Sequence, residues 1–391
     1  MERASMFNPL PTWPVLYLYT GMIAFVLSAF LMPLGINLLR RFNVMDEVQP
    51  NKIHKAPVPR GGGIVIFIAF AIAVLLPDYR DNPMKGVLLG SFICLVVGAI
   101  DDFRGGVPAV IKFGALVVAT IIMSQFGVQL KIFQYYPLDL AFTLFWIVGV
   151  TSAFNGIDNM DGLAAGVAVI VSVMYLIIAV ESYFLAGTET SLSWFGLLAS
   201  GLIGSNLGFL LYNFKPAKVF MGDSGSFFLG FVLSALGVMG EWTENRVIAA
   251  TIPILILGVP IFDFAYIIIM RIIKGETRTL RDVIEHCAPD HLSHRLVWFG
   301  FSQRKAVLFI YMMCIALGTS GILLRNSDSG LDSIMALLQG GVIVLLIVAL
   351  MLTAETRHAN EQKKSASYIL DLNKAIEENG DKKKFKMTVM K

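Results

Sequence analysis

Charged residues are scarce in this chain, and their scarcity excludes several classes of protein. Of the 391 residues, only 15% are Asp, Glu, Lys or Arg, whereas 56% are hydrophobic. Soluble domains have about a quarter charged residues and about half apolar ones. The net charge of +3 gives no polyanion-binding surface. The composition therefore excludes a soluble enzyme, a disordered chain and a nucleic-acid-binding domain.

Cysteine is also rare, and the usual metal and nucleotide motifs are missing. Cys94, Cys287 and Cys314 are an odd, scattered set, which argues against a disulfide framework. The sequence has no H-E-x-x-H zinc motif and no G-x-x-x-x-G-K-[ST] phosphate-binding loop. Any chemistry must therefore come from another arrangement of residues.

Long apolar runs are what the sequence does contain. A bilayer core of about 30 Å needs about 20 mostly apolar helical residues. The pattern predicts an all-α polytopic membrane protein of about eleven transmembrane helices, with a transmembrane catalytic domain over 1–353 and a charged cytoplasmic tail over 354–391. The predicted spans are 15–38, 62–77, 86–100, 108–127, 137–154, 163–181, 193–212, 225–240, 247–270, 304–324 and 332–353.

The distribution of basic residues predicts the orientation. Of the 31 Lys and Arg residues, 25 fall on one side of the predicted spans. Cytoplasmic loops carry the excess of Lys and Arg. We therefore expect a multi-pass membrane protein with the N-terminus outside and the tail in the cytoplasm.

Polar residues gather in the connections on the predicted cytoplasmic side. Asp101 and Asp102 end the third span, where adjacent carboxylates repel each other and suit a general base or a magnesium-linked site. A polar end that simply caps the helix is an equal alternative for this pair. Asp223 precedes the eighth span and, taken alone, would be an ordinary helix cap, but with the other acids on the same side it becomes a plausible metal ligand.

A second acidic segment follows the fifth span. Asn155, Asp158 and Asp161 are spaced by three, so in a helix they would lie along one face. Three oxygen-bearing side chains on one stripe can hold a hard cation or bind the hydroxyl groups of a ligand. Because 155–162 has no Lys or Arg, a functional role is favoured over simple solvation.

Basic residues and histidines complete the candidate site. Lys52, His54 and Arg60 precede three glycines at a helix start, where cations and free backbone N–H groups favour phosphate. Basic flanks of a span and glycines that aid helix packing are the alternative.

The longest connection on the same side, 271–305, contains His291, His294 and Arg295, which suit anion contact or proton transfer better than zinc binding.

Two functions fit polar residues at helix ends. Carboxylates, an amide and cations together suit Mg²⁺-assisted phosphoryl transfer between a water-soluble substrate and a lipid phosphate. An ion-coupled transporter is the alternative, but transporter sites lie near the middle of the membrane. Acids on one side only therefore favour the transferase.

These motifs, in this order, resemble the polyprenyl-phosphate N-acetylhexosamine-1-phosphate transferases, and the resemblance extends over spans one to ten. Lys52-Ile53-His54, Pro59-Arg60-Gly61-Gly62 and His291-Leu292-Ser293-His294-Arg295-Leu296 are similar to the N-acetylglucosamine branch rather than to the peptidoglycan branch. The resemblance implies transfer of a sugar 1-phosphate from a UDP-N-acetylhexosamine to polyprenyl (undecaprenyl) phosphate. GlcNAc-1-phosphate is the sugar phosphate that the resemblance favours. UMP is released, and the product starts a cell-envelope glycan. The implied location is the bacterial inner membrane, with the active site on its cytoplasmic face. The implied partners are these two substrates and the membrane, with no nucleic acid and with a homodimer left open.

The resemblance also implies roles for individual residues. Asp101 would deprotonate or orient the lipid phosphate with help from Asp102, and Mg²⁺, or Mn²⁺ in its place, would be held by Asp223 and Asn155. The remaining implied assignments are Asp158 and Asp161 in the catalytic set, holding nucleotide or sugar; Asn213 and Phe220 at uracil; His291, His294 and Arg295 at the diphosphate or sugar; and Lys52, His54, Arg60 and Arg104 as further substrate-binding residues.

Three positions depart from the pattern of the family. Ser152 stands where an Asn is frequent, Asn159 replaces a common Gly, and Ser293 replaces a histidine in the usual H-x-H-H pattern. The acids survive these changes, so the implied chemistry is kept. Asp263 also matches a family position, with a structural pairing role and a catalytic role equally open.

Overall fold

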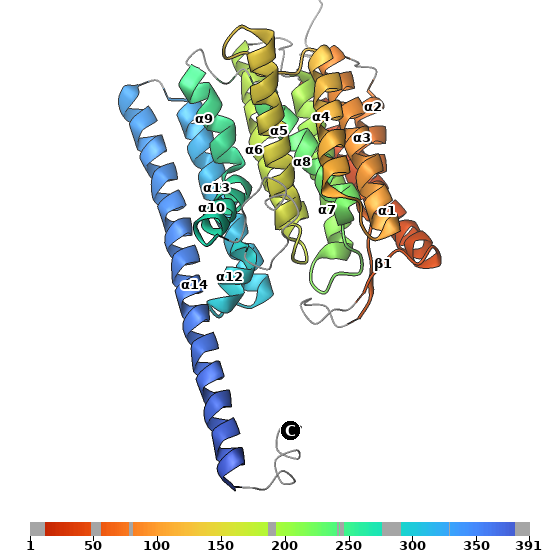
Figure 1. Cartoon of the computed structure of the whole chain (residues 1–391). Coiled ribbons are helices and arrows are strands. Elements are labelled where there is room, and N and C mark those ends of the chain that lie inside the picture. The colour runs from red at the N-terminus through yellow and green to blue at the C-terminus, as the bar shows by residue number, and fades with distance from the viewer. Residues whose placement is uncertain are drawn as a thin grey trace, which may run out of the picture.

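The computed structural model describes residues 12–47, 56–77, 81–186, 193–240, 242, 246–275, 291–327 and 329–379. Within them the chain is a bundle of helices with one small antiparallel sheet, in which β1 pairs with β2 (Figure 1). The elements are α1 Thr12–Arg41, β1 Met45–Asp46, β2 Val58–Pro59, α2 Gly63–Leu75, α3 Asn82–Arg104, α4 Ala109–Gln125, α5 Tyr136–Ile157, α6 Leu163–Ala186, α7 Ser193–Asn213, α8 Gly222–Met239, α9 Arg246–Ile256, α10 Gly258–Ile273, α12 Leu292–Trp298, α13 Gln303–Arg325 and α14 Gly330–Asn379.

The prediction of an all-α, multi-pass membrane protein is confirmed. Among the described residues, eight helices are long and apolar enough to cross a membrane, and the bent pair α9–α10 makes nine if it is counted as one span. The helices α2 and α4 are apolar but shorter. Each predicted segment therefore contains a helix, while the helices that meet the length for a full crossing number fewer than the eleven expected.

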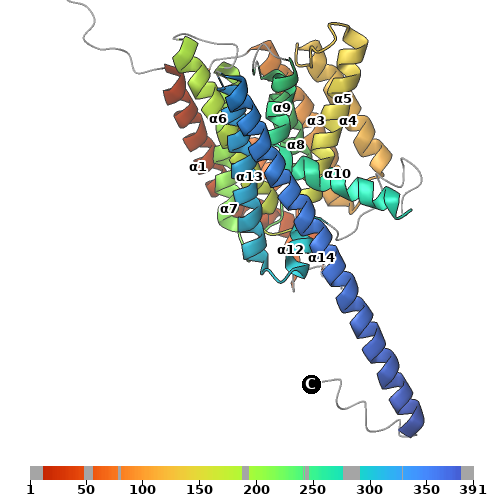
Figure 2. The ribbon, with the colours of Figure 1, turned by 90° about the vertical axis from the view of Figure 1, so that its left-hand side faces the viewer.

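The predicted span 247–270 is not one straight helix. The chain bends by 88° between α9 and α10, so α10 lies across the direction of the bundle (Figure 2). Pro260 has no N–H with which to continue hydrogen bonding to the carbonyl of Ile256, the last residue of α9. The proline therefore separates two helical segments that hydropathy alone joins.

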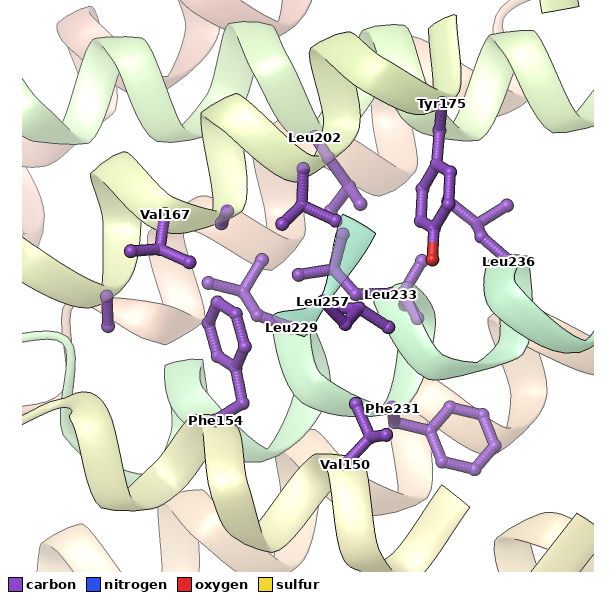
Figure 3. Close-up of a cluster of buried hydrophobic side chains, with 14 of the residues drawn as sticks. Val150, Phe154, Val167, Tyr175, Leu202, Leu229, Phe231, Leu233, Leu236 and Leu257 are labelled. Carbon is purple, nitrogen blue, oxygen red and sulfur yellow. The ribbon is translucent and has the colours of Figure 1, made fainter. Parts of the chain in front are cut away.

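The helix α8 lies at the centre of the bundle. Its apolar window is 83% buried inside the protein, compared with 22% for α14. Figure 3 shows leucines of α8 between apolar side chains of its neighbours: Val150 and Phe154 of α5, Val167 of α6 and Leu202 of α7. Because lipid tails are as apolar as these side chains, close packing rather than exclusion of water holds such helices together.

Glycines allow three helices to meet at one end of the bundle. A Cβ atom at Gly63 of α2 would overlap the backbone of Gly225 of α8, and one at Gly98 of α3 would overlap the backbone of Asp223. Close backbone approach through small residues is typical of membrane helices. The start of α8 is therefore fixed directly against α2 and α3.

The last helix, α14, is 50 residues long, which corresponds to about 75 Å. It passes through the predicted boundary at 353/354 without a break and projects beyond the other helices (Figures 1 and 2). The first part of the predicted tail is therefore helical up to Asn379.

Candidate active site

Three carboxylates converge where α3 ends and α8 begins. Asp101, Asp102 and Asp223 each offer an oxygen, and these oxygens lie within 4.8 Å of one another. The side chains of Asp101 and Asp102 are 6% and 0% exposed, while that of Asp223 is 22% exposed. This acidic cluster, Asp101, Asp102 and Asp223, brings together residues that sequence analysis placed in separate connections.

Arg60 balances part of the charge of the acidic cluster. Its Nη2 donates to Asp101 Oδ2 at 2.9 Å, and its Nε donates to Asp102 Oδ1 at 3.0 Å. Burial alone would lower the pKa of the Arg60 guanidinium, but the nearby carboxylates raise it above its ordinary value. Arg60 therefore stays charged and holds the two aspartates in place.

Lys112 is the second cation, and sequence analysis assigned it no role. Its Nζ lies 2.7 Å from Asp101 Oδ1 and 2.5 Å from Asp223 Oδ2, and it lies 5.6 Å from the centre of the Phe227 ring. The available signal was one lysine in the otherwise apolar α4, since a charge at that depth calls for a partner. One ammonium group thus bridges the end of α3 to the start of α8.

Asp102 caps α8 although it belongs to α3. Its carboxylate accepts hydrogen bonds from the backbone N–H groups of Asp223 at 2.9 Å and of Ser224 at 3.0 Å. Gly222 has φ +73°, and a Cβ there would overlap this carboxylate. Free N–H groups at a helix start are satisfied by such acceptors. Asp102 therefore fixes the backbone that carries Asp223.

The glycine run after Arg60 does not leave its N–H groups free for phosphate. Gly61 and Gly62 donate to the carbonyl of Phe220 at 3.2 and 2.9 Å, and Gly63 donates to the carbonyl of Met221 at 2.9 Å. The expectation of free backbone donors there is wrong, because the segment pairs with the chain that enters α8. The paired segments instead place Arg60 beside the acidic cluster.

Asp158 follows the last residue of α5 and interacts electrostatically with the acidic cluster. Burial, together with the charges of Asp223 and Asp102 and against the opposing effect of Arg60, raises the pKa of its carboxyl to about 8. Asn155 lies almost one turn earlier, at the same end of α5, which packs on α8 through Thr151 and Gly230. Both residues therefore lie at the end of the bundle that holds the acidic cluster.

Asp161 and Asn213 hold two loops together. Asp161 Oδ2 accepts from the backbone N–H of Ala217 at 3.1 Å. Asn213 Oδ1 accepts from Gly162 N–H at 2.8 Å, and its Nδ2 donates to the Val219 carbonyl at 2.9 Å. These bonds shape the loop that leads to the half-buried Phe220.

The histidine segment contacts the turn that follows α5. His291 Nδ1 lies 2.7 Å from Asp263 Oδ2, and its ring lies so close to Gly156 that a Cβ there would come within 2.8 Å of Cε1. The pairing role considered for Asp263 is therefore realised. Two of the residues that depart from the family pattern bind each other, since Ser293 Oγ donates to Asn159 Oδ1 at 2.6 Å.

The remaining predicted site residues lie outside the acidic cluster or outside the residues that the structure describes. Arg295 is buried and donates to Glu355 of α14 at 2.8 Å, while His294 is half-buried and Arg104 is exposed at the end of α3. Lys52 and His54 lie outside the described residues.

Known proteins resemble the chain over most of its length. The sequence model of glycosyl transferase family 4 matches residues 84–241, from α3 to just beyond α8. A probable undecaprenyl-phosphate N-acetylglucosaminyl 1-phosphate transferase of Bacillus subtilis is 34% identical over 363 residues, which cover 88% of this chain and 94% of the relative.

Two further relatives belong to related enzymes. A decaprenyl-phosphate N-acetylglucosaminephosphotransferase of Mycolicibacterium smegmatis is 29% identical over 80% of this chain and 82% of its own length. A phospho-N-acetylmuramoyl-pentapeptide-transferase of Streptococcus equi subsp. zooepidemicus is 32% identical over 58% of this chain and 75% of its own length.

The helices and the acidic cluster define a polytopic membrane protein with a charged site at one end of its bundle. Its relatives make it a phosphosugar transferase rather than an ion-coupled transporter. The chain belongs to the polyprenyl-phosphate N-acetylhexosamine-1-phosphate transferases of glycosyl transferase family 4.

Proposed function

We propose that this protein transfers N-acetylglucosamine 1-phosphate from UDP-N-acetylglucosamine to a polyprenyl phosphate in the bacterial inner membrane, on its cytoplasmic face. The observation that carries the proposal is the acidic cluster with its two cations at one end of a membrane-embedded bundle. The N-acetylglucosamine donor is favoured because the relatives named for that sugar match 80% and 88% of the chain, whereas the match to the pentapeptide-transferase covers 58%. Other UDP-N-acetylhexosamines are the alternative donors.

The proposed reaction exchanges one phosphorus–oxygen bond for another. An oxygen of the polyprenyl phosphate attacks the sugar-bearing phosphorus of the UDP-sugar, and the bond from that phosphorus to UMP breaks. UMP leaves with the electron pair, and polyprenyl-diphosphate-sugar remains. Such transfers depend on positioning and on electrostatic stabilisation more than on covalent chemistry by the protein.

The donor set of the site suits Mg²⁺. Carboxylate and amide oxygens are its usual protein ligands, and the ammonium group of Lys112 already lies between oxygens of Asp101 and Asp223 as a cation would. Asp223 and Asn155 are the proposed ligands. When bound, Mg²⁺ neutralises charge on the diphosphate oxygens.

The residues of the acidic cluster and its two cations have separate roles in the proposed reaction. Asp101 orients the lipid phosphate or takes a proton from it, and Arg60 and Lys112 hold the Asp101 carboxylate in place. Asp102 keeps Asp223 in position through the backbone of α8. Because each of these contacts exists before substrate binds, little rearrangement is needed at the moment of reaction.

Residues around the cluster would hold the donor. Asp158 and Asp161 contact nucleotide or sugar, and Asn213 keeps Phe220 placed for stacking on uracil. His291 and His294 contact the diphosphate or sugar, at the turn where His291 already meets Gly156.

An assay with radiolabelled UDP-N-acetylglucosamine, polyprenyl phosphate and Mg²⁺ tests this function. The purified full-length protein should give lipid-soluble label and free UMP, and both should disappear on chelation. A panel of UDP-sugars should show a preference of about tenfold or more for the N-acetylglucosamine donor. Equal or better turnover of another UDP-N-acetylhexosamine would replace the sugar but keep the reaction, while failure with every donor would contradict the function.

A further inference from the structure

The short helix α12 depends on its neighbours for its position. It has only seven residues, Leu292–Trp298, and helices of that length are not stable on their own in water. At its N-terminal end, the backbone N–H of Leu292 and the ring of His291 both bind Asp263 of α10. His291 therefore stays beside the turn after α5 only while α12 keeps its register against α10.

The other side of α12 is attached to the long helix α14. Arg295 is 3% exposed, and its Nη1 donates to Glu355 Oε2 at 2.8 Å and to the Met351 carbonyl at 3.2 Å. The guanidinium carbon lies 5.1 Å from the centre of the Tyr266 ring. Arg295 is linked back to the histidine, because its backbone N–H donates to the carbonyl of His291 at 3.0 Å.

Glu355 binds three side chains, which come from α12 and from α10 with the residue that follows it. Besides Arg295 of α12, it accepts from Tyr266 of α10 at 3.4 Å and forms an ion pair with Lys274, which follows α10. Loss of this carboxylate would remove a charged acceptor from the buried Arg295, which is unfavourable for the local arrangement. A residue on the last helix thereby fixes how α12 sits on α10.

We propose that Glu355 is a positioning residue for the transferase reaction, holding α12 through Arg295 so that His291 remains in place beside the donor. This inference rests on the proposed function, in which His291 and His294 contact the diphosphate or sugar of the UDP-sugar. Glu355 has no part in the acidic cluster that carries Asp101 and Asp223. Its loss therefore weakens use of the UDP-sugar and leaves use of the lipid phosphate unchanged.

Steady-state kinetics of full-length variants test this separation. Glu355→Ala should raise KM for UDP-N-acetylglucosamine about tenfold, and Glu355→Gln, which keeps a neutral acceptor, should raise it about threefold. KM for polyprenyl phosphate should change by less than about twofold in both variants. If Glu355→Ala does not fold, Glu355→Gln carries the test by itself.

Glu181→Ala is the matched control. Glu181 also binds an arginine of a neighbouring helix, Arg325 of α13, at 2.9 Å, but it lies at the other end of the bundle. Its loss should leave KM for the UDP-sugar unchanged even where melting temperature falls. An equal rise of KM in Glu181→Ala and in the Glu355 variants, or no rise in the latter, would overturn the proposal.

A double variant tests whether the effect passes through the histidine. If Glu355 acts by holding His291, then His291→Ala should cost less in the Glu355→Ala background than in the wild type. Fully multiplicative losses contradict the proposal. Turnover by the wild type in the same assay separates the two claims. Its absence contradicts the proposed function together with this inference, whereas wild-type turnover with normal Glu355 variants contradicts the inference alone.

Discussion

Buried carboxylates have different partners at the two ends of the helix bundle. At the end that holds the acidic cluster, three carboxylates lie within 4.8 Å of one another and share the cations Arg60 and Lys112. At the other end, Asp139 of α5 accepts from the backbone N–H groups of Ile132 and Phe133 at 3.0 and 2.8 Å. One end therefore holds several carboxylates close together. At the other end, a single carboxylate accepts hydrogen bonds from the loop that precedes its own helix.

The difference separates a site from a structural contact. Like charges held together lower stability unless cations or a ligand compensate them, whereas a carboxylate that caps backbone N–H groups adds stability without any ligand. Clusters of interacting titratable groups mark functional sites for this reason. The two ends of the bundle thus supply both the test residues and their controls.

The largest effect is expected where the grouped charges are reduced. Asp101→Asn and Asp223→Asn keep the size of each side chain but remove a carboxylate of the proposed reaction. Each should lower turnover of UDP-N-acetylglucosamine by about a thousandfold or more, while the protein still inserts into the membrane. Turnover is measured on purified protein, and insertion by the yield in the membrane fraction.

Asp139→Asn provides the comparison for these variants. It removes a carboxylate that is as buried as that of Asp101 and accepts from backbone donors, so it should lower melting temperature and leave turnover per folded molecule within about twofold. Near-normal activity of Asp101→Asn or Asp223→Asn would contradict the roles assigned to them.

A smaller loss is expected from Lys112→Met, which removes the cation between Asp101 and Asp223. Turnover should fall by about tenfold to a hundredfold, because the two carboxylates lose a shared partner and repel each other. The melting temperature without divalent ions should also fall. Added Mg²⁺ should raise it by more in this variant than in the wild type, since Lys112 no longer neutralises the same oxygens.

Lys85→Met is the control for that comparison. Lys85 lies in the first turn of α3 at the other end of the bundle, where it is exposed and bound to Asn82. It should leave turnover and the response to Mg²⁺ unchanged. An Mg²⁺ response of Lys112→Met no larger than that of Lys85→Met would show that Lys112 and the metal do not share these oxygens.

The helices and the acids of the site could be predicted from the sequence, because both follow from local patterns. Long apolar runs mark spans, and charged residues at their ends stand out against a chain with few charges. Asp101 and Asp223, which the sequence placed on the same side of the predicted spans, both lie within the acidic cluster. An apolar run shows that a segment is buried in the membrane but not whether its helix is straight, so hydropathy did not predict the 88° bend after Ile256.

Partners that depend on packing could not be predicted. Lys112 belongs to the site only because α4 packs against α3, whose end meets the start of α8, which no spacing along the chain reveals. The N–H groups of Gly61 and Gly62 donate to the backbone carbonyl of Phe220, which lies far away in the sequence. Arg295 follows the histidines directly but points to α14. Residue type gave the chemistry of these groups, and tertiary packing decided which partner each one binds.

The pH dependence of stability should sharpen the comparison through Asp158. Burial raises the pKa of this carboxyl from 3.8 to about 8, so the folded protein favours the protonated form. Its contribution to stability is complete below pH 3.8 and is lost as pH rises through about 8. In the metal-free protein, the melting temperature of the wild type should therefore fall by a few degrees relative to Asp158→Asn between about pH 6.5 and 9.

Added Mg²⁺ provides the control for Asp158. A cation beside the acidic cluster favours the ionised carboxylate, so the difference between wild type and Asp158→Asn should shrink when Mg²⁺ is present. Differential scanning fluorimetry over the pH range measures both curves. Parallel curves without metal would contradict a raised pKa of Asp158 in the folded protein.

The smallest expected effect concerns Asn159 and Ser293, which join the turn after α5 to α12. The hydroxyl of Ser293 donates to Asn159 Oδ1 at 2.6 Å, and Asn159 Nδ2 donates to the carbonyl of Gly156 at 2.7 Å. Asn159→Gly and Ser293→Ala should each lower kcat/KM for the UDP-sugar by about twofold to tenfold, because each removes one partner of a partly buried hydrogen bond.

Their double variant should lose little more than either single variant. A coupling of about 1 kcal/mol between the two positions is expected in kcat/KM, as is usual for residues in direct contact. Thr353→Ala offers a control, since its hydroxyl binds only the carbonyl of Ala349 in its own helix. If the losses of Asn159→Gly and Ser293→Ala multiply, the two substitutions act separately. The bond between them would then have no role in holding α12 against the donor.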